Sequence, residues 1–400
     1  ITYLEENRAY SASEKRVSEL PVWVFDRQTG QASQAASFAT EALQQIYPEA
    51  PYIYLERTWL PDSSSLLVQV NPYPWGEGIL QPTGLLYRVD VPAGTAHLLL
   101  SAGEYELISL SPDGAQLAAL DTAALTPDGS FDFERYQQGI LRLIDMKTGE
   151  TTFTLPLTLA LDPWSFMPPK YAPDGAHLVI YVEGGLGVVD TQTGSLQLVP
   201  LENTCLAENN CWWTDYVPVF WLPDGRSFYT LQSVNDYFNE RAETTLSQVF
   251  LEEPPRIETL AILHANTVSF SPDRRTLTYW NQPDVEEFEQ DPKLMNRVTF
   301  YLMDSQVLEP RRYALAYGHR LLEWHPDSQR FLFTYSARGG ANLERDRLGV
   351  GHICRPPQEL TLPRQAGVSQ VRWLDDSHIL VWTYWHGASP STSTPGLYLY

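Results

Sequence analysis

Basic residues are scarce in this chain of 400 residues. It carries 27 Lys and Arg against 49 Asp and Glu, which gives a formal net charge of -22. A nucleic-acid backbone requires clustered Lys and Arg, and an anionic lipid surface attracts the same residues, so both kinds of partner are disfavoured. The acidic balance remains compatible with secretion, with cation binding or simply with solubility.

Long apolar runs and cysteines are also few. No apolar run approaches the roughly twenty residues that a membrane helix requires. The chain starts Ile1-Thr2-Tyr3 without a Met, so we expect that a leader or an upstream segment has been removed. Of the three cysteines, Cys205 and Cys211 enclose a short polar loop and are predicted to form a disulfide, whereas Cys354 is expected to be a small buried side chain. These features favour a secreted, periplasmic or cell-surface protein.

One short motif recurs through most of the chain. The tetrapeptide Ser111-Pro112-Asp113-Gly114 lies between two apolar runs, as expected of a tight turn between two strands. Similar turns place aspartates at 62, 113, 174, 224, 273, 327 and 376. The fifth and sixth copies lack the Gly, and the seventh, Leu374-Asp375-Asp376, lacks the Pro. A period of about fifty residues indicates a repeat architecture.

Each repeat contains four strand-like runs. The Pro-Asp turn joins the first two, and an Asp-x-x-x-Gly turn such as Asp145 to Gly149 joins the last two. In the third repeat the runs are 170–172, 177–182, 186–189 and 195–199. We therefore predict an all-β fold, a seven-bladed β-propeller of four-stranded antiparallel blades over residues 52–400.

The pattern of an apolar residue, Ser-Pro-Asp-Gly and an apolar strand resembles the WD40-like (PD40) repeat of TolB-type propellers. Related repeats occur in the propeller domains of prolyl-oligopeptidase-type peptidases. The resemblance covers about residues 52 to 400 and implies a propeller fold. It implies no particular activity, because propellers host many functions.

The segment before the repeats has two predicted parts. Residues 1–20 read as a flexible or surface-draped lead, and residues 21–51 contain a strand at Val22 to Phe25 and one short helix over 35–47. The last repeat stops one strand short, which would leave a sheet edge exposed. We expect Val22 to Phe25 to supply this outer strand; the alternative is that the natural chain extends past Tyr400.

The repeat also predicts where the loops lie. Both tight turns emerge at one face of a propeller, and the longer connections emerge at the opposite face. These connections are 71–84, 122–138, 160–168, 201–216, 233–246, 281–296, 336–350 and 385–395. They hold many aromatic residues, which we take as the candidate binding face: Tyr73, Trp75, Phe131, Phe133, Tyr136, Trp164, Trp212, Trp213, Tyr237, Phe238 and Trp385.

No catalytic motif is found. The chain has no Gly-x-Ser-x-Gly, no paired-histidine zinc motif and no Cys-x-x-Cys-His, so we predict neither a hydrolase site, a zinc site nor a haem site. The recurrent turn aspartates are expected to satisfy turn N–H groups. One acidic loop offers weak calcium ligands, Asp284, Glu286, Glu287 and Asp291, although its spacing matches no calcium motif.

These features lead to a prediction of a non-catalytic extracytoplasmic propeller that binds a protein partner, or less favourably a glycan, on its loop-rich face. Two alternatives stay open. One is a structural subunit of a surface assembly that uses its N-terminal segment to join neighbours. The other is an enzyme that acts on a saccharide or a lactone at the central channel.

Overall fold

The computed structural model describes residues 18–26, 29–46, 53–72, 84–121, 138–159, 168–201, 214–215, 219–236, 241–263, 267–281, 297–336, 346–360, 366–385 and 394–399. These residues are nearly all β, in antiparallel sheets, and one helix of six residues, α1 (Glu41–Ile46), is present among them. The chain divides into two compact units, Ile1–Asn203 and Thr204–Tyr400, which we describe separately. No helix in the described part of the chain is long and apolar enough to cross a membrane.

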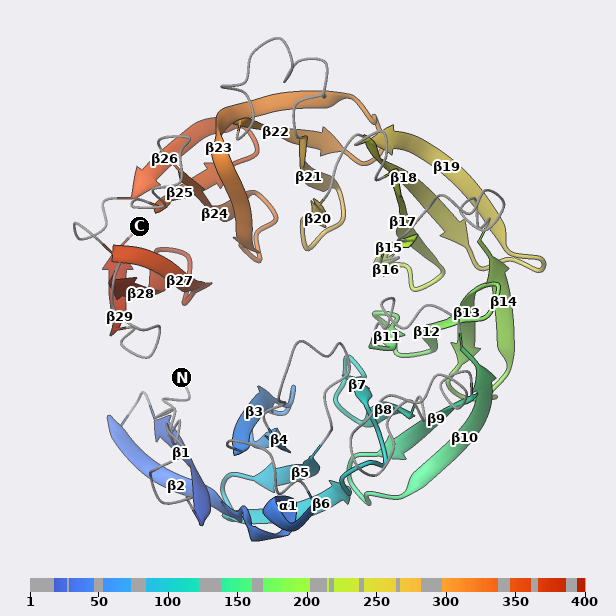
Figure 1. Cartoon of the computed structure of the whole chain (residues 1–400), viewed down its shortest axis with the longest axis vertical. Coiled ribbons are helices and arrows are strands. Elements are labelled where there is room, and N and C mark those ends of the chain that lie inside the picture. Colours follow the sequence, from blue (N-terminus) through green and yellow to red (C-terminus); the bar gives the residue numbers. More distant parts are fainter. Residues whose placement is uncertain are drawn as a thin grey trace. The chain divides into compact units, whose positions relative to one another are not determined.

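The first unit contains a hairpin and three four-stranded sheets, labelled in Figure 1. The hairpin is β1 (Glu19–Asp26) and β2 (Gln31–Ala39). The sheets are β3 (Ile53–Trp59), β4 (Ser65–Pro72), β5 (Leu85–Asp90) and β6 (Thr95–Leu100); β7 (Leu107–Leu110), β8 (Gln116–Asp121), β9 (Gln138–Asp145) and β10 (Thr151–Thr158); and β11 (Lys170–Tyr171), β12 (His177–Val182), β13 (Gly185–Asp190) and β14 (Leu196–Pro200).

The second unit repeats this pattern. Its first sheet has β15 (Thr214–Asp215), β16 (Val219–Trp221), β17 (Ser227–Asp236), β18 (Arg241–Phe250) and β19 (Arg256–Leu263). A seven-stranded sheet follows: β20 (Thr267–Phe270), β21 (Thr276–Asn281), β22 (Arg297–Asp304), β23 (Pro310–Trp324), β24 (Arg330–Ser336), β25 (Asp346–His352) and β26 (Arg355–Leu360). The last sheet is β27 (Ala366–Trp373), β28 (His378–Trp385) and β29 (Thr394–Leu399).

One long strand explains the seven-stranded sheet. The first half of β23 pairs with β22, from Pro310 to Tyr317, and the second half pairs with β24, up to Trp324. The strand therefore ends one four-stranded set and begins the next. With β23 shared in this way, the predicted repeat is present in both units.

The apolar core lies between the faces of successive sheets. In the first unit, Leu67 and Leu86 of one sheet pack with Leu117 and Ile144 of the next. In the second unit, Leu246 packs with residues from β20–β22 such as Leu277. A second strand such as β4 is buried along almost its whole length, whereas a fourth strand such as β6 is largely exposed.

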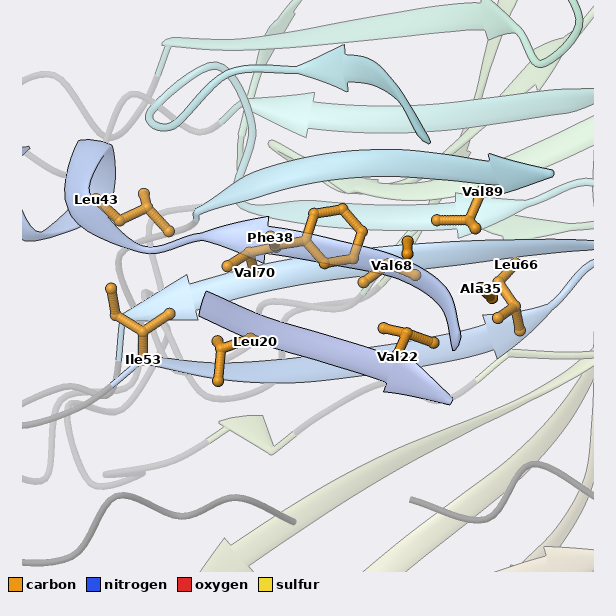
Figure 2. Close-up of a cluster of buried hydrophobic side chains, with 11 residues drawn as sticks. Leu20, Val22, Ala35, Phe38, Leu43, Ile53, Leu66, Val68, Val70 and Val89 are labelled. Carbon is orange, nitrogen blue, oxygen red and sulfur yellow. The ribbon is translucent and has the colours of Figure 1, made fainter. Parts of the chain in front are cut away.

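The N-terminal hairpin corrects the predicted helix. Residues 31–39 form strand β2, so the helix predicted over 35–47 is limited to α1. Phe38 and Ala35 pack with Leu20 against Val68 of the first sheet, as Figure 2 shows, and this burial outweighs the helix propensity of the segment. Val22 to Phe25 are in a strand, as predicted, and pair with β2 along one edge of β1. Their predicted role as the closing strand of the last blade stays a prediction. The predicted lead is also shorter, because Leu20 is buried in β1.

One predicted loop is mostly strand. The sequence predicts a connection over 233–246, whereas β17 runs to Asp236 and β18 starts at Arg241, with an antiparallel register that extends to these ends. Alternating Thr, Ser and Leu residues in 244–247 suit a half-buried strand better than a loop. The other predicted connections agree with the strand ends to within a few residues.

Candidate functional site

The Pro-Asp and Asp-x-x-x-Gly turns join the strands at one end of each sheet, which we call the turn edge. In these turns Asp carboxylates accept hydrogen bonds from neighbouring backbone N–H groups. At the first-to-second turn of sheet β7–β10, Asp113 Oδ1 accepts hydrogen bonds from the Ser111 hydroxyl (2.6 Å) and from the Ala115 N–H (3.0 Å). These two bonds hold the pKa of Asp113 below its ordinary value. Asp62, Asp174, Asp224, Asp273 and Asp327 accept equivalent N–H bonds. The structural role predicted for these aspartates agrees with this geometry.

The seventh turn differs from its predicted alignment. Asp375, not Asp376, accepts the turn bond, from the Ser377 N–H at 2.9 Å. That bond and the contact with His378 lower the pKa of Asp375 to about 2. This turn, which lacks the Pro, is one residue shorter than the others. The Leu374 N–H bonds to the backbone oxygen four residues later, of His378, whereas in the other turns, as from Ser111 to Gln116, this bond spans five residues. The carboxylate of Asp376 is therefore released from the turn and is 93% exposed.

The longer connections leave from the opposite ends of the strands, which we call the loop-bearing edge. Strand β4 ends there at Pro72 and β5 starts at Leu85, and β8 ends at Asp121 before β9 starts at Gln138. In the second unit the corresponding pairs of strand ends are Asp236 and Arg241, Asn281 and Arg297, Ser336 and Asp346, and Trp385 and Thr394. The connections that hold the predicted aromatic residues therefore start and finish at one edge of their sheets.

Most predicted site residues lie outside the described residues. This applies to Tyr73, Trp75, Phe131, Phe133, Tyr136, Trp164, Trp212, Trp213, Tyr237 and Phe238, to the calcium candidates Asp284, Glu286, Glu287 and Asp291, and to the predicted disulfide Cys205–Cys211. Trp385 is the last residue of β28. Within the described ranges, no group of three or more His, Cys, Asp and Glu residues could hold a metal ion.

Cys354 is exposed, which corrects the prediction of a buried side chain. It lies in the turn between β25 and β26, where its N–H donates to His352 Nδ1 at 3.0 Å. The four residues His352-Ile353-Cys354-Arg355 include no Gly or Pro that would mark a turn. The turn, and with it the exposure of Cys354, was therefore not predicted from the sequence.

The sequence did not predict a cluster of charged residues that lies at the turn edge of the second unit. Arg330 Nε donates to Asp327 Oδ2 at 2.6 Å, and Arg330 Nη1 donates to the backbone oxygen of Asp376 at 2.5 Å. His325 is buried between them, with Nδ1 3.1 Å from Asp327 Oδ2 and Nε2 3.4 Å from Asp376 Oδ1. Partial burial raises the pKa of Asp327, but bonds from the Gln329 N–H and Arg330 outweigh it and bring this pKa to about 2.

The aromatic side of this cluster is Trp373. Its ring meets the His325 ring edge-on, with centroids 4.6 Å apart, and the Arg330 guanidinium lies 5.3 Å from its centroid. His325 Nδ1 accepts the backbone N–H of Asp327 at 3.1 Å, Nε2 lies beside the Asp376 carboxylate, and the residue is 3% exposed. The cluster therefore joins two turns. The burial of His325 and its contacts within the cluster are those of a structural residue.

The sequence matches no family model and no curated protein. Several solved structures resemble the chain at low identity. An oligogalacturonate lyase in complex with manganese is 14% identical, with a TM-score of 0.47, over 84% of this chain and 86% of that one. The β-propeller domain of the Trilobed protease from Pyrococcus furiosus is 9% identical, with a TM-score of 0.49, over 87% and 95%. Pyrococcus horikoshii acylaminoacyl peptidase is 12% identical, with a TM-score of 0.45, over 72% and 43%.

These likenesses correct the functional prediction. The sequence predicts a non-catalytic binding or scaffolding module and no enzyme activity. The structures that resemble the chain are those of a lyase, a peptidase and the propeller of a protease, so the prediction of a non-catalytic scaffold is contradicted. A likeness at this level assigns neither a substrate nor a reaction to the chain itself.

Proposed function

We propose that this chain is a seven-bladed β-propeller of the TolB-like type and that it acts as an enzyme on a saccharide bound at the loop-bearing edge of its sheets. The observation that supports the proposal is the division between the two edges. At the turn edge the carboxylates are occupied by their own backbone. The connections with the aromatic residues all leave from the other edge.

Aromatic residues in these connections suit a sugar ring. The faces of Trp and Tyr are flat and apolar, and their edges carry a hydrogen-bond donor. A pyranose ring is similar, with C–H groups on one face and hydroxyls around its rim. Stacking of such a ring on Trp75, or on the adjacent Trp212 and Trp213, buries apolar surface without dehydrating the hydroxyls.

The net charge favours an uncharged saccharide. A chain of charge -22 repels a polyuronate substrate at long range, and this repulsion lowers both the association rate and the affinity. A uronate would require a bridging cation, for which the acidic connection with Asp284 and Asp291 is the proposed calcium site. We therefore propose a neutral oligosaccharide as substrate, and an extracytoplasmic location in which such polymers occur.

The test is an activity screen of the purified full chain. Neutral oligosaccharides and oligouronates would be incubated with the protein in EDTA and in calcium, and new reducing ends and unsaturated products would be measured. We expect turnover of a neutral oligosaccharide that persists in EDTA. Turnover of oligouronates alone would contradict the proposed substrate, and no turnover of any saccharide would contradict the proposed activity.

A pair of tryptophan variants tests the location of the site. Trp75 lies in a connection at the loop-bearing edge, whereas Trp59 is the last residue of β3, 36% exposed, immediately before the Leu60-Pro61-Asp62 turn. Trp75→Ala is expected to lower kcat/KM by about thirtyfold, the effect of losing an aromatic contact of about 2 kcal/mol. Trp59→Ala should leave kcat/KM within about twofold of the wild type. A larger loss of kcat/KM in Trp59→Ala than in Trp75→Ala would place the site at the turn edge.

A further inference from the structure

Successive turns in the first unit touch through apolar contacts. A Cβ atom built on Gly114 would lie 2.6 Å from Pro61 Cδ, and one on Gly175 would lie 3.9 Å from Pro112 Cδ. The proline of each turn thus packs on the glycine of the next. These proline–glycine contacts are apolar and depend on the fit between the rings and the glycine backbone. Elsewhere between the first two sheets, Arg88 of β5 donates to the Met146 backbone oxygen at 2.8 Å.

The contact between the last two turns is chemically different. The turn at Leu374-Asp375-Asp376 has neither Pro nor Gly, and the turn before it has Ser328 in the glycine position. Here Arg330 of β24 joins the two turns in place of a proline–glycine contact. It donates to Asp327 in its own turn and to the Asp376 backbone oxygen in the next. The Arg330 side chain is 17% exposed, so these bonds form largely out of water, where they are stronger.

A second polar contact runs in parallel to the first. Glu323 Oε2, on β23, accepts the backbone N–H of Trp373 at 3.0 Å, and Glu323 Oε1 lies 3.6 Å from Arg372 Nη1. Both Trp373 and Arg372 belong to β27. Two residues of the preceding sheet therefore bond to the last sheet: Glu323 to strand β27 and Arg330 to the turn that follows it.

An apolar contact also joins the described residues of the two sheets. Its buried members are Val371, Ile379 and Val381 of the last sheet, against Leu332, Leu348 and Val350 of β24 and β25. Leu360, Val368 and Trp373 are partly buried against the same cluster. The polar contacts of Arg330 and Glu323 lie beside this apolar contact.

We propose that the last sheet, β27–β29, is a detachable unit of the fold, and that Arg330 is the latch that keeps it docked on β24 and β25. Loss of the guanidinium would leave the Asp327 carboxylate and the Asp376 carbonyl without their common partner. Without this shared donor, an open state in which water reaches both groups is favoured. The last sheet then opens locally while the other sheets of the unit remain folded.

Native-state hydrogen exchange of the full chain tests the latch. In Arg330→Met, amide exchange in β27 and β28 is expected to be at least about tenfold faster than in the wild type, while β20–β22 and the first unit keep their rates. The matched control is Arg347→Met, since Arg347 pairs with Glu359 at 3.0 Å within β25 and β26 and does not join two sheets in that contact. This control should leave β27 and β28 unchanged.

Two further variants keep the test decisive if Arg330→Met folds poorly. Arg330→Lys keeps the charge but cannot reach both partners with one planar fork, so it should give a smaller acceleration confined to β27 and β28. Asp376→Ala keeps the backbone oxygen that Arg330 binds, and should change exchange by less than about threefold. Unchanged exchange in both Arg330 variants, or a uniform acceleration across 204–400, would overturn the proposal.

Discussion

At the scale of single residues, two glycines with the same backbone conformation have different surroundings. Gly114 and Gly175 both follow a turn aspartate, with φ of 71° and 72°. Alanine is strained at either position, by about 1 kcal/mol. At Gly114 the added Cβ would also meet Pro61 Cδ at 2.6 Å, whereas at Gly175 the nearest atom is 3.9 Å away.

We therefore expect Gly114→Ala to destabilise the first unit more than Gly175→Ala, by about 1 to 3 kcal/mol beyond the backbone term. Urea denaturation followed by tryptophan fluorescence measures both variants under the same conditions. Equal midpoints would mean that the contact between Pro61 and Gly114 does not restrict the turn.

Cys354 provides a second prediction at this scale. The thiol is exposed, so it should react with iodoacetamide in the native protein within minutes. The sequence predicts that Cys205 and Cys211 are joined and do not react until a reductant is added. Peptide mass spectrometry distinguishes the three residues, and alkylation of all three without reductant would exclude the disulfide.

The residue scale also shows what sequence can and cannot provide. The turn role of Asp113 could be predicted because its chemistry acts within a few residues of itself. The cluster at Arg330 could not, because it joins positions 46 residues apart in sequence. Asp376 was assigned to the turn because it follows the repeat spacing, and only the hydrogen bond to Asp375 shows that the turn is one residue shorter.

At the scale of elements, the turns predict a loss of stability in acid. The folded-state pKa values of Asp327 and Asp375 are about 2, below the ordinary value of 3.8, and those of Asp62, Asp113, Asp145 and Asp190 are also lowered. A lowered pKa stabilises the fold above about pH 4, and the stabilisation is lost as the pH falls toward 2. The free energy of unfolding should therefore decrease over this interval.

Replacing one turn carboxylate with an amide tests whether the charge of these carboxylates causes the loss of stability in acid. Asp113→Asn cannot ionise, so it should be less stable than the wild type by about 1 kcal/mol at pH 6. The difference should shrink toward pH 2.5, where the wild-type carboxylate is increasingly protonated. A difference that stays constant with pH would mean that the charge of Asp113 does not contribute.

The N-terminal hairpin is the element that sequence reasoning assigned incorrectly. Residues 35–39 contain helix formers, but their apolar side chains face the first sheet, and pairing with β1 satisfies the backbone. Phe38 lies at the centre of this contact, with its ring 4.7 Å from that of Tyr87. The strands of the repeats were easier to predict because each is bounded by a recurrent turn.

A matched pair of variants measures how firmly the hairpin is held. Phe38→Ala should destabilise the first unit by about 3 to 5 kcal/mol, since Phe38 is buried with 4% exposure. Trp23→Ala removes a side chain of the same hairpin that is 40% exposed, and should cost less than about 1 kcal/mol. Thermal unfolding of the two variants is the measurement, and a larger cost for Trp23→Ala would mean that the opposite face of the hairpin is the buried one.

At the scale of the whole molecule, the regular spacing of turns carried most of the prediction of the fold. Each repeat folds as a sheet whose two edges have different roles, and the same division holds in both units. The proposed location of the candidate site rests on this division, because long connections on a rigid scaffold commonly carry function. The division does not indicate the chemistry, and no repeat carries a catalytic motif in its sequence.

The most direct test of this division is hydrogen exchange of the full chain with and without a neutral oligosaccharide that it turns over. The account predicts slower exchange in the connections 73–83, 122–137 and 202–213 and at the strand ends that flank them, with no change at the turns around Asp113 and Asp224. Protection at those turns, with none in the connections, would contradict it.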